Sequence, residues 1–385
     1  MNVDARSAMR WVWAEIDLDA IRYNVEYLRS VVAPSAVWAV VKADAYGHGA
    51  VDVARAAIDA GAEGLCVASV PEGIELRRAG IDAPILLLSE QPPETAARII
   101  EHRLTPTVYT RAFLDALASE RPNGLPVHLK VDTGMQRVGA HTHNVGSLVA
   151  AIEERAPALR LAGVFTHLAV ADDPEDDYTD LQLKRLDDAL RHTPGVPLVH
   201  AANSAGAITH ADARRSFVRA GIAIYGISPG PGVDGLCSEL RPALELRSRV
   251  SYVKQVRAGS RVSYGLRHTF PQDTTVATIP IGYADGVPRR LWATGGEVLI
   301  KGRRRPIVGV VTMDQLMVDC GEPVGEDDEV RVGDDVVLIG QQDGPDGPQR
   351  IRVEDWAEQL DTIGYEIVCG ISKRVPRVPR RSIDT

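Results

Sequence analysis

The sequence predicts an α/β protein, with an N-terminal (β/α)8 barrel of the TIM type followed by a mainly β domain. Short apolar runs alternate with helical patterns over residues 11–243. From about Leu244 the pattern becomes strand-like alternation separated by Gly and Asp turns. No G-x-G-x-x-G follows the first strand, which weighs against the alternative of a doubly wound dinucleotide-binding sheet. We therefore expect a tail over 1–10, a barrel over 11–243 and a mainly β domain over 244–385.

The barrel elements are predicted from the spacing of their apolar residues. Residues 11–18 alternate as a strand, and a helix with apolar Ile21, Val25 and Leu28 follows. Val37–Val41 is a nearly all-apolar run, typical of a strand buried on both faces. A helix is expected over 50–60. The later strand and helix pairs are predicted at 65–68 and 71–79, 85–88 and 93–101, 105–108 and 110–119, 127–131 and 144–154, 161–166 and 178–192, and 198–201 with a short helix, before a last strand at 217–222.

The second domain is predicted from alternating segments of period two. A polar loop is expected over 341–348 and a helix over 353–360. The strands are predicted at 244–256, 275–280, 297–300, 306–312 and 336–339.

Length, charge and cysteine content narrow the class of protein. A chain of 385 residues is long for one domain, which favours two. The net charge of −9 argues against nucleic acid or an anionic membrane as partner. We expect no membrane span and no secretory signal. The cysteines form no C-x-x-C pair, which fits a cytoplasmic enzyme with reduced thiols.

Lys42 is the first candidate for chemistry. It follows directly on the buried Val37–Val41 strand, and parallel barrels carry their catalytic groups at that end of the strands. A partly desolvated amine has a lowered pKa and can form an imine with a carbonyl. The structural alternative is a lysine whose stem packs at a strand end while its amine reaches water. Tyr46, Gly47 and Gly49 favour the chemical interpretation, because a phenol and close-approaching backbone suit a phosphate.

The segment A-V-V-K-A-D-A-Y-G-H-G around Lys42 resembles the pyridoxal-phosphate lysine signature of the alanine racemase family. Eight further segments resemble blocks of that family, in the family's order, and together they cover nearly the whole chain after Trp11. The blocks are His128–Gly139, Phe165–Ala169, His200–Gly206, Val218–Gly226, Val262–Gly265, Ile281–Gly286, Val311–Asp314 and Gly364–Cys369. The resemblance implies pyridoxal 5'-phosphate as cofactor, alanine as substrate and a racemase supplying D-alanine for peptidoglycan.

Phosphate binding is expected after the seventh and eighth barrel strands, where barrels often bind this group. By strand count Ser204 and the amides of Gly221 and Ile222 lie in those loops, and glycine allows close approach to an anion. Taken singly, Ser204 and Gly221 could be ordinary turn residues. The resemblance adds Asn203 and the hydroxyls of Tyr46 and Tyr365 to the cofactor site.

Arg219 is the ring-nitrogen partner that the resemblance implies. A guanidinium stays charged and can only donate, so the ring nitrogen stays unprotonated and the ring is a weaker electron sink. Proton exchange at Cα is then favoured over transamination or decarboxylation. A decarboxylase of related architecture would normally place a carboxylate here.

Racemisation needs an acid/base group on each face of a planar carbon. Lys42 serves one face, and the V-S-Y-G block makes Tyr264 the group on the other. The ordinary pKa of a phenol, about 10, has to be lowered for this role. The resemblance implies that His167 links Tyr264 to Arg219, and that the second domain of one subunit completes the barrel site of the other. An obligate homodimer with shared active sites is therefore expected.

The resemblance also assigns the substrate contacts. Arg137 would bind the cofactor's phenolic oxygen and the substrate carboxylate, and the backbone amide of Met313 would reach the same carboxylate. Tyr283 would narrow the way in, which suits a methyl side chain. Lys130 is often carbamylated in the family, which would place an anion beside Arg137. Unmodified, its ammonium would repel that arginine.

Three other interpretations are weighed against this one. A broad-specificity or serine racemase of the same fold would share every motif. A non-catalytic pyridoxal-phosphate-binding protein would resemble the barrel alone, without the domain that carries Tyr264. His141 and His143 could pair on a metal, but no acidic third ligand is evident nearby, and the acidic stretch over 172–180 lacks calcium-loop spacing, so we expect no metal site.

Overall fold

The structure is a computed structural model that describes residues 10–380. The chain divides into two compact units. One unit comprises residues 19–241, and the other combines residues up to 18 with residues from 242 onward.

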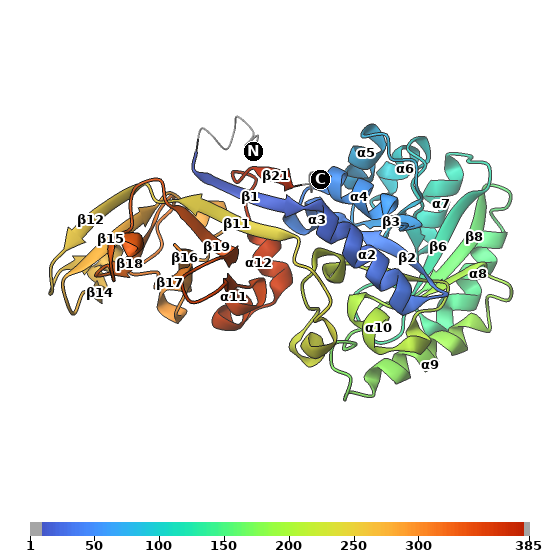
Figure 1. The fold of residues 1–385 in the computed structure, drawn as a ribbon. Helices are drawn as coiled ribbons and strands as arrows, with labels where there is room; N and C mark the ends of the chain where they lie inside the picture. The colour runs from blue at the N-terminus through green and yellow to red at the C-terminus, as the bar shows by residue number, and fades with distance from the viewer. Residues whose placement is uncertain (1–9, 381–385) are drawn as a thin grey trace. The chain divides into compact units, whose positions relative to one another are not determined.

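Within residues 19–241, eight parallel strands form the first unit's sheet, with helices on the outside (Figure 1). The strands are β2 (Ala36–Val40), β3 (Gly64–Val67), β4 (Ile85–Leu87), β5 (Thr107–Val108), β6 (Leu125–Asp132), β8 (Leu159–Phe165), β9 (Leu198–His200) and β10 (Phe217–Ala220). A further two-residue strand, β7 (Ala140–His141), pairs with the end of β6.

Backbone hydrogen bonds close this sheet into a barrel. The paired orders are β10-β2-β3-β4 and β5-β6-β8-β9. The amide of Leu87 donates to Thr105 O at 2.9 Å and joins the two runs at one side. The amide of Ser216 donates to Val199 O at 2.9 Å and joins them at the other. The ring is complete, and the predicted barrel is confirmed.

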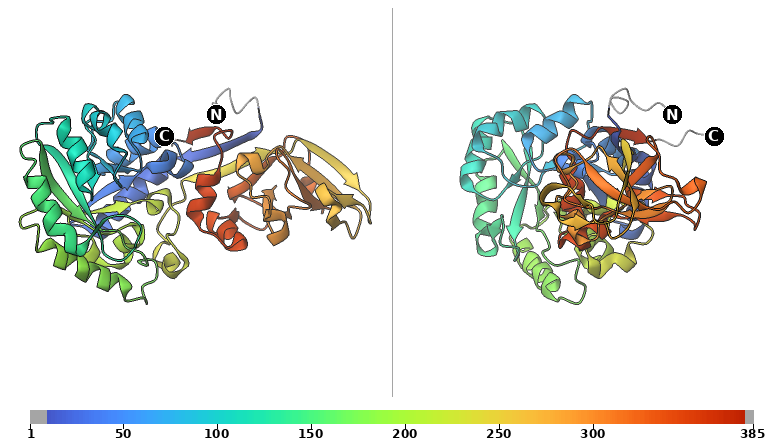
Figure 2. Two further views of the ribbon diagram at one scale, coloured as in Figure 1. Left: turned by 180° about the vertical axis from the view of Figure 1, so that it is seen from behind. Right: turned by 90° about the vertical axis from the view of Figure 1, so that its left-hand side faces the viewer.

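Amphipathic helices cover the barrel, as the left view of Figure 2 shows. Helix α4 is representative: its buried residues Val53, Ala54 and Ala57 recur at helical spacing, and its polar residues face outward. The helices are α2 (Leu18–Val32), α4 (Ala50–Asp59), α5 (Val70–Arg78), α6 (Ala96–Glu101), α7 (Arg111–Ser119), α8 (Val145–Glu153), α9 (Tyr178–Leu190) and α10 (Ser204–Thr209).

The second unit is mainly β. Its larger sheet runs β17-β16-β19-β11-β1-β21, with β20 paired to β19, and a three-stranded sheet runs β12-β15-β18. The short hairpin β13–β14 forms a two-stranded sheet of its own. Helices α11 (Val353–Leu360) and α12 (Gly364–Gly370) complete the unit (Figure 1). The strands are β1 (Val12–Asp17), β11 (Leu244–Arg249), β12 (Tyr252–Val256), β13 (Arg261–Val262), β14 (His268–Thr269), β15 (Thr274–Ile279), β16 (Glu297–Ile300), β17 (Arg303–Pro306), β18 (Leu316–Gly321), β19 (Asp335–Gln342), β20 (Gln349–Ile351) and β21 (Arg377–Arg380).

The first strand of the chain belongs to this second unit. We assigned residues 11–18 to the barrel, but β1 pairs antiparallel with β11 and parallel with β21. Alternating apolar residues specify a half-buried strand without specifying its sheet, which explains the difference.

Two strand predictions in the second unit need correction. The segment 306–312 is a strand only to Pro306, after which Ile307 makes an isolated bridge to Val318. The segment 244–256 is two strands, β11 and β12, which pair in different sheets. Strand β18 was missed, although its buried Leu316, Val318 and Cys320 alternate with less buried residues.

Arg10, the last residue of the expected tail, is firmly held. Its guanidinium donates to both carboxylate oxygens of Asp285, at 2.6 Å each, and to Pro280 O at 3.1 Å. The prediction of a tail over residues 1–9 lies outside the described residues. In the part of the chain that the structure describes, no helix combines the length and apolar character that crossing a membrane requires.

Candidate active site

Lys42 opens a turn of unusual handedness at the carboxyl end of β2. The next four residues, Ala43–Tyr46, have φ between 52° and 54° and ψ between 38° and 52°, so this single turn, α3 (Lys42–Gly47), is left-handed. L-residues adopt this conformation at a cost of about 1–2 kcal/mol each. Such a run persists only where its surroundings hold it, and functional sites are where it is usually found.

Two carboxylates and a histidine hold this turn. Glu72 on α5 accepts from the amide of Ala43 at 2.8 Å. Asp44 accepts from the amide of Ala50 at 2.8 Å and so ties the turn to α4. The Nδ1 atom of His48 lies 3.1 Å from Ala45 O. The backbone beyond Lys42 is therefore fixed from three directions.

Arg219 on β10 lies buried among neutral acceptors. Its Nη1 donates to His200 Nδ1 at 2.7 Å, and its Nη2 donates to the carbonyls of Thr166 and Ala201 at 2.8 Å each. Nη2 also lies 3.2 Å from His167 Nδ1. Burial lowers the pKa of Arg219 to about 10, so the guanidinium remains charged near neutral pH. In residues 10–380, none of its hydrogen-bond acceptors is a carboxylate, and its Nε takes part in no hydrogen bond.

Four cationic side chains gather at this end of the barrel. Burial, followed by the charges of Arg219, Arg137 and Lys42, lowers the pKa of Lys130 to about 7. Burial, followed by the charges of Arg219 and Lys130, lowers the pKa of His167 well below its usual value, so that imidazole is neutral. Arg137 is exposed in the loop after β6. A small hollow lies here, lined by Lys130, Asp132, Met135, Arg137, Thr166 and His167.

The loops after β9 and β10 form a compact polar group. Ser204 Oγ accepts from the amides of Gly221 at 2.8 Å and Ala223 at 3.3 Å. Asn203 caps α10 by accepting from the amide of Gly206 at 2.9 Å. Gly221 permits close approach of Tyr46, because a Cβ on Gly221 would lie 2.6 Å from Tyr46 Oη.

This group of residues suits an anionic cofactor with a ring nitrogen. A phosphate needs hydrogen-bond donors, and the hydroxyls of Ser204 and Tyr46 can supply them. The amide of Ile222 can also donate, because Ile222 is the first residue of a 3-10 turn and its amide has no acceptor within that turn. Arg219 has donor capacity left for a ring nitrogen with a lone pair. The surrounding cations favour both the phosphate and a substrate carboxylate. The donor set therefore fits pyridoxal phosphate.

Three predicted site residues lie on the surface of the second unit. Tyr264, Met313 and Tyr283 are 71%, 53% and 40% exposed. Tyr264 follows Ser263, whose φ of 65° is held by a hydrogen bond from its Oγ to Val310 O at 2.6 Å. The fourth predicted residue of this unit, Tyr365, lies in α12.

The Tyr283 and Met313 loops form one body. The amide of Tyr283 donates to Thr312 O at 3.0 Å, and that of Ala284 donates to Met313 O at 3.1 Å. A Cβ at Gly282 would lie 2.3 Å from Thr312 O, so only glycine allows this approach. The two residues that were expected to shape the substrate site are therefore positioned together.

Comparison with known proteins decides the family. The family model "Alanine racemase, N-terminal domain" matches residues 16–229, and "Alanine racemase, C-terminal domain" matches residues 243–379. The chain belongs to the alanine racemase family. The predicted resemblance and the predicted class, an amino-acid racemase, are confirmed.

Individual alanine racemases match over nearly their full length. The alanine racemase of Symbiobacterium thermophilum is 49% identical over 376 residues, covering 96% of this chain and 97% of its own. That of Geobacillus stearothermophilus is 42% identical, covering 96% and 93%. The structure of alanine racemase from Bacillus anthracis with bound L-Ala-P has a TM-score of 0.89 at 39% identity, covering 97% of this chain and 96% of that one.

The structure thus brings together the predicted residues of the barrel and adds several that the racemase motifs did not single out. Glu72, His200 and His128 were missed as site residues. His200 and His128 are each the first residue of a segment that resembles a family block. Their position in these segments was the signal that could have identified them. Glu72 gave one local signal only, the Ser69-x-x-Glu72 capping box at the start of α5.

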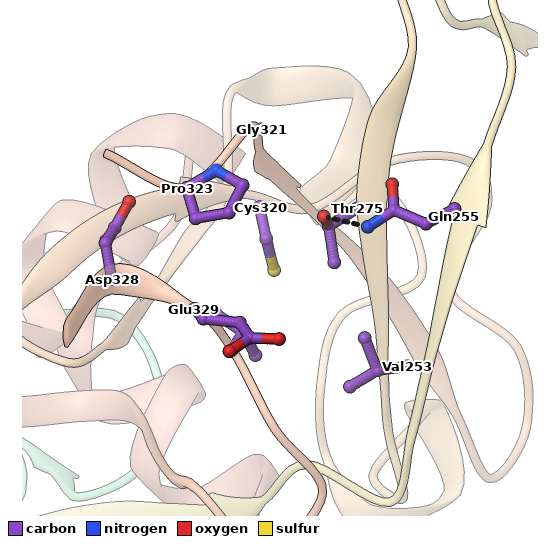
Figure 3. A pocket seen from close by; sticks show the side chains of 9 residues that line it. Val253, Gln255, Thr275, Cys320, Gly321, Pro323, Asp328 and Glu329 are labelled. Carbon is purple, nitrogen blue, oxygen red and sulfur yellow. Dashed lines mark hydrogen bonds between the residues drawn. The ribbon is translucent and has the colours of Figure 1, made fainter. Parts of the chain in front are cut away.

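A second hollow lies in the mainly β unit, and no predicted site residue lines it (Figure 3). Gln255 donates to Thr275 Oγ1 at 3.0 Å on one side, and the Asp328 carboxylate pairs with Arg303 and Arg305. Burial raises the pKa of the Cys320 thiol to about 11, which keeps it protonated and unreactive. The polar side chains of Gln255, Thr275 and Asp328 therefore have protein partners, which is consistent with a structural role.

Proposed function

We propose that this chain interconverts L-alanine and D-alanine by moving protons between two faces of the substrate Cα, with pyridoxal phosphate as cofactor. The observation that carries this proposal is the buried Arg219 guanidinium, bonded to neutral acceptors alone. The cofactor, when bound, supplies acidity at the substrate Cα. A donor-only partner at its ring nitrogen limits that electron withdrawal, which favours proton exchange over decarboxylation.

Each proton transfer is assigned to a residue of this chain. Lys42 would hold the cofactor through its amine, and that amine takes or returns a proton on one face of the substrate Cα. Tyr264 of the partner subunit returns or takes a proton on the other face. Arg219 donates to His167 Nδ1, so the neutral imidazole carries its proton on Nε2 and can donate to a phenolate. Such a donor stabilises the anion and lowers the pKa of the phenol.

The remaining predicted residues take binding roles in this proposal. Ser204, Tyr46, Tyr365 and the amides of Gly221 and Ile222 hold the phosphate, and Asn203 holds the start of α10. Arg137 and the amide of Met313 bind the substrate carboxylate, and Tyr283 limits side-chain size. We place the activity in the cytoplasm, where D-alanine would enter peptidoglycan synthesis.

Lys130 is proposed to carry a carbamate. With a pKa near 7, about half of this amine is neutral at neutral pH and can add to CO2, giving a carbamate and releasing a proton. The product turns one of four neighbouring cations into an anion beside Arg137. Carbon-13 NMR of protein equilibrated with labelled bicarbonate should show a carbamate signal that the Lys130→Met variant lacks. A spectrum unchanged by that substitution would reject the modification.

The dimeric site can be tested by complementation. Lys42→Ala and Tyr264→Phe should each be nearly inactive. Co-expression gives mixed dimers in which one site has both intact residues, so about a quarter of wild-type activity is expected from random assembly. A site contained within one subunit would give no recovery.

Racemisation assays across several L-amino acids with added pyridoxal phosphate test the substrate. Alanine should turn over fastest, because the loop carrying Tyr283 leaves room for a methyl group. Strong turnover of serine or lysine with none of alanine would reject the assignment in favour of a racemase of other specificity.

For Tyr264→Phe, deuterium wash-in at Cα should be lost from one enantiomer far more than from the other. Binding of cofactor without any exchange at Cα would favour the non-catalytic alternative.

A further inference from the structure

His200 stands behind Arg219 in a stack of aromatic rings. It is fully buried on β9, between Phe165 of β8, at 4.4 Å and 9° between planes, and Phe217 of β10, at 4.2 Å and 24°. Trp38 of β2 continues the stack beyond Phe217 at 4.4 Å. The flanking rings fix the plane of the imidazole, and its edge is directed at Arg219.

The hydrogen bonds of this imidazole have one consistent assignment. A guanidinium has only donors, so the 2.7 Å contact from Arg219 Nη1 requires a lone pair on His200 Nδ1. A neutral His200 then carries its proton on Nε2. That atom lies 3.0 Å from Nδ1 of His128, which must accept and in turn carries its own proton on Nε2.

Charge and burial keep both histidines neutral. Burial and then the nearby Arg219 lower the pKa of His200 well below its usual value, and that of His128 to about 4. Protonation of His200 at Nδ1 would place its N–H opposite an N–H of Arg219, with no acceptor between them. Since both rings stay uncharged at working pH, the direction of hydrogen bonding runs from Arg219 through His200 to His128.

The backbone is shaped to admit this chain. His128 on β6 faces Gly163 on β8, with which it is paired in register. A Cβ at position 163 would lie 2.6 Å from His128 Nδ1 and 2.7 Å from its Cε1. Any side chain there would displace the ring that accepts from His200, so glycine serves a close approach here.

We propose that His200 is a positioning residue for Arg219, and that His128 fixes the tautomer of His200 from behind. The pair holds one edge of the guanidinium so that its remaining N–H groups stay directed at the ring nitrogen of the cofactor. This proposal rests on the proposed function for the role of Arg219, and it adds two residues that act through that arginine. A histidine that merely filled the core would need shape but no defined tautomer.

The tautomers of His200 and His128 can be determined without measuring activity. Nitrogen-15 NMR of histidine-labelled holoenzyme distinguishes protonated from unprotonated ring nitrogens. His200 and His128 should both show unprotonated Nδ1 and protonated Nε2, and His200→Asn identifies the His200 signal by its loss. A protonated Nδ1 on His200 would overturn the proposal whether or not the enzyme racemises alanine.

Two substitutions of His200 distinguish the effect of its hydrogen-bond acceptor from the effect of its side-chain volume. An asparagine side chain places an oxygen near the position of the imidazole Nδ1, whereas the longer glutamine reaches toward that of Nε2. His200→Asn therefore keeps the bond to Arg219, and His200→Gln loses it. Cofactor affinity, measured by absorbance titration of apoenzyme, should fall by less than about threefold for His200→Asn and by about tenfold or more for His200→Gln. The exposed His192→Asn is the control and should match wild type. Equal losses for the two variants would show a volume effect and reject a positioning role.

Discussion

The carboxylate of Glu72 accepts a hydrogen bond, at 2.8 Å, from the amide of Ala43, the residue that follows Lys42. Its other oxygen accepts from the amides of Ala68 at 2.7 Å and Ser69 at 3.1 Å. One side chain therefore links the left-handed turn after β2 to the loop after β3. The site lysine is positioned by the neighbouring βα unit as well as by its own strand.

Removing this link should loosen the turn. We expect Glu72→Ala to reduce turnover about tenfold and to cost about 1–2 kcal/mol of unfolding free energy, because it deletes charge-assisted hydrogen bonds to strained backbone. Glu72→Gln should be intermediate, since its amide nitrogen cannot accept. Glu75→Ala, an exposed change on the same helix, is the control for kinetics and thermal unfolding. Similar kinetics for Glu72→Ala and Glu75→Ala would contradict a role for Glu72.

The contact between Gly221 and Tyr46 gives a second prediction. Gly221→Ala should weaken cofactor binding, because the new Cβ would lie 2.6 Å from Tyr46 Oη. Tyr46→Phe removes that oxygen, so the double variant should lose less affinity than the sum of the two single losses. Gly235→Ala, whose Cβ would meet nothing within 4 Å, is the matched control. Strictly additive losses would show that the two groups do not meet.

The elements of the fold that could be predicted are those whose signal is local. Val37–Val41 is apolar throughout, and a buried strand ending at Lys42 follows from that run alone. The sheet of β1 could not be predicted, because its partners β11 and β21 lie more than two hundred residues away in the chain. Strand β18 is different: its alternation was present in the sequence and was overlooked.

In the candidate site, too, the features with a local sequence signal could be predicted and those set by distant residues could not. Lys42 and Arg219 lie in recognisable motifs. The left-handed turn Ala43–Tyr46 could not be predicted, because residues other than glycine rarely adopt this conformation. It depends on Glu72, 29 residues from Ala43 in the chain. The tautomer of His200 likewise depends on the contact between Arg219 and His200 Nδ1. A sequence motif does not show that these two side chains meet.

Lys130 should make stability depend on pH. Its pKa falls from 10.5 in the unfolded chain to about 7 in the folded protein. Between these values the unfolded state binds more protons, so the free energy of unfolding rises with pH, by roughly 5 kcal/mol at most. Below pH 7 the amine is protonated in both states and its full destabilising effect is present.

Denaturant unfolding of cofactor-free protein, in buffer freed of CO2, measures this contribution. The difference in unfolding free energy between wild type and Lys130→Met should change with pH from about 7 toward 10. Lys184→Met removes an exposed lysine of the same unit and should leave the slope unchanged. Parallel curves for wild type and Lys130→Met would mean that the folded-state pKa is not lowered.

The buried Asp285 anchors the body formed by the Tyr283 and Met313 loops. Besides its two bonds from Arg10, it accepts from the amide of Gly282 at 3.0 Å and lies 3.5 Å from Arg374 Nε. Arg374 also donates to Asp314 at 2.7 Å, next to Met313. A fully buried carboxylate between two arginines leaves uncompensated charge when it is removed.

Asp285→Asn should therefore cost about 3 kcal/mol of unfolding free energy and raise the KM for alanine more than it lowers kcat, because the loops proposed to bind substrate lose their common anchor. Asp82→Asn is the matched control: its partner Arg103 and its own side chain are 73% and 81% exposed, so the change should stay below about 0.5 kcal/mol. Thermal unfolding and steady-state kinetics on the two variants give both numbers. Equal, small effects for Asp285→Asn and Asp82→Asn would show that the loops are held by their backbone hydrogen bonds alone.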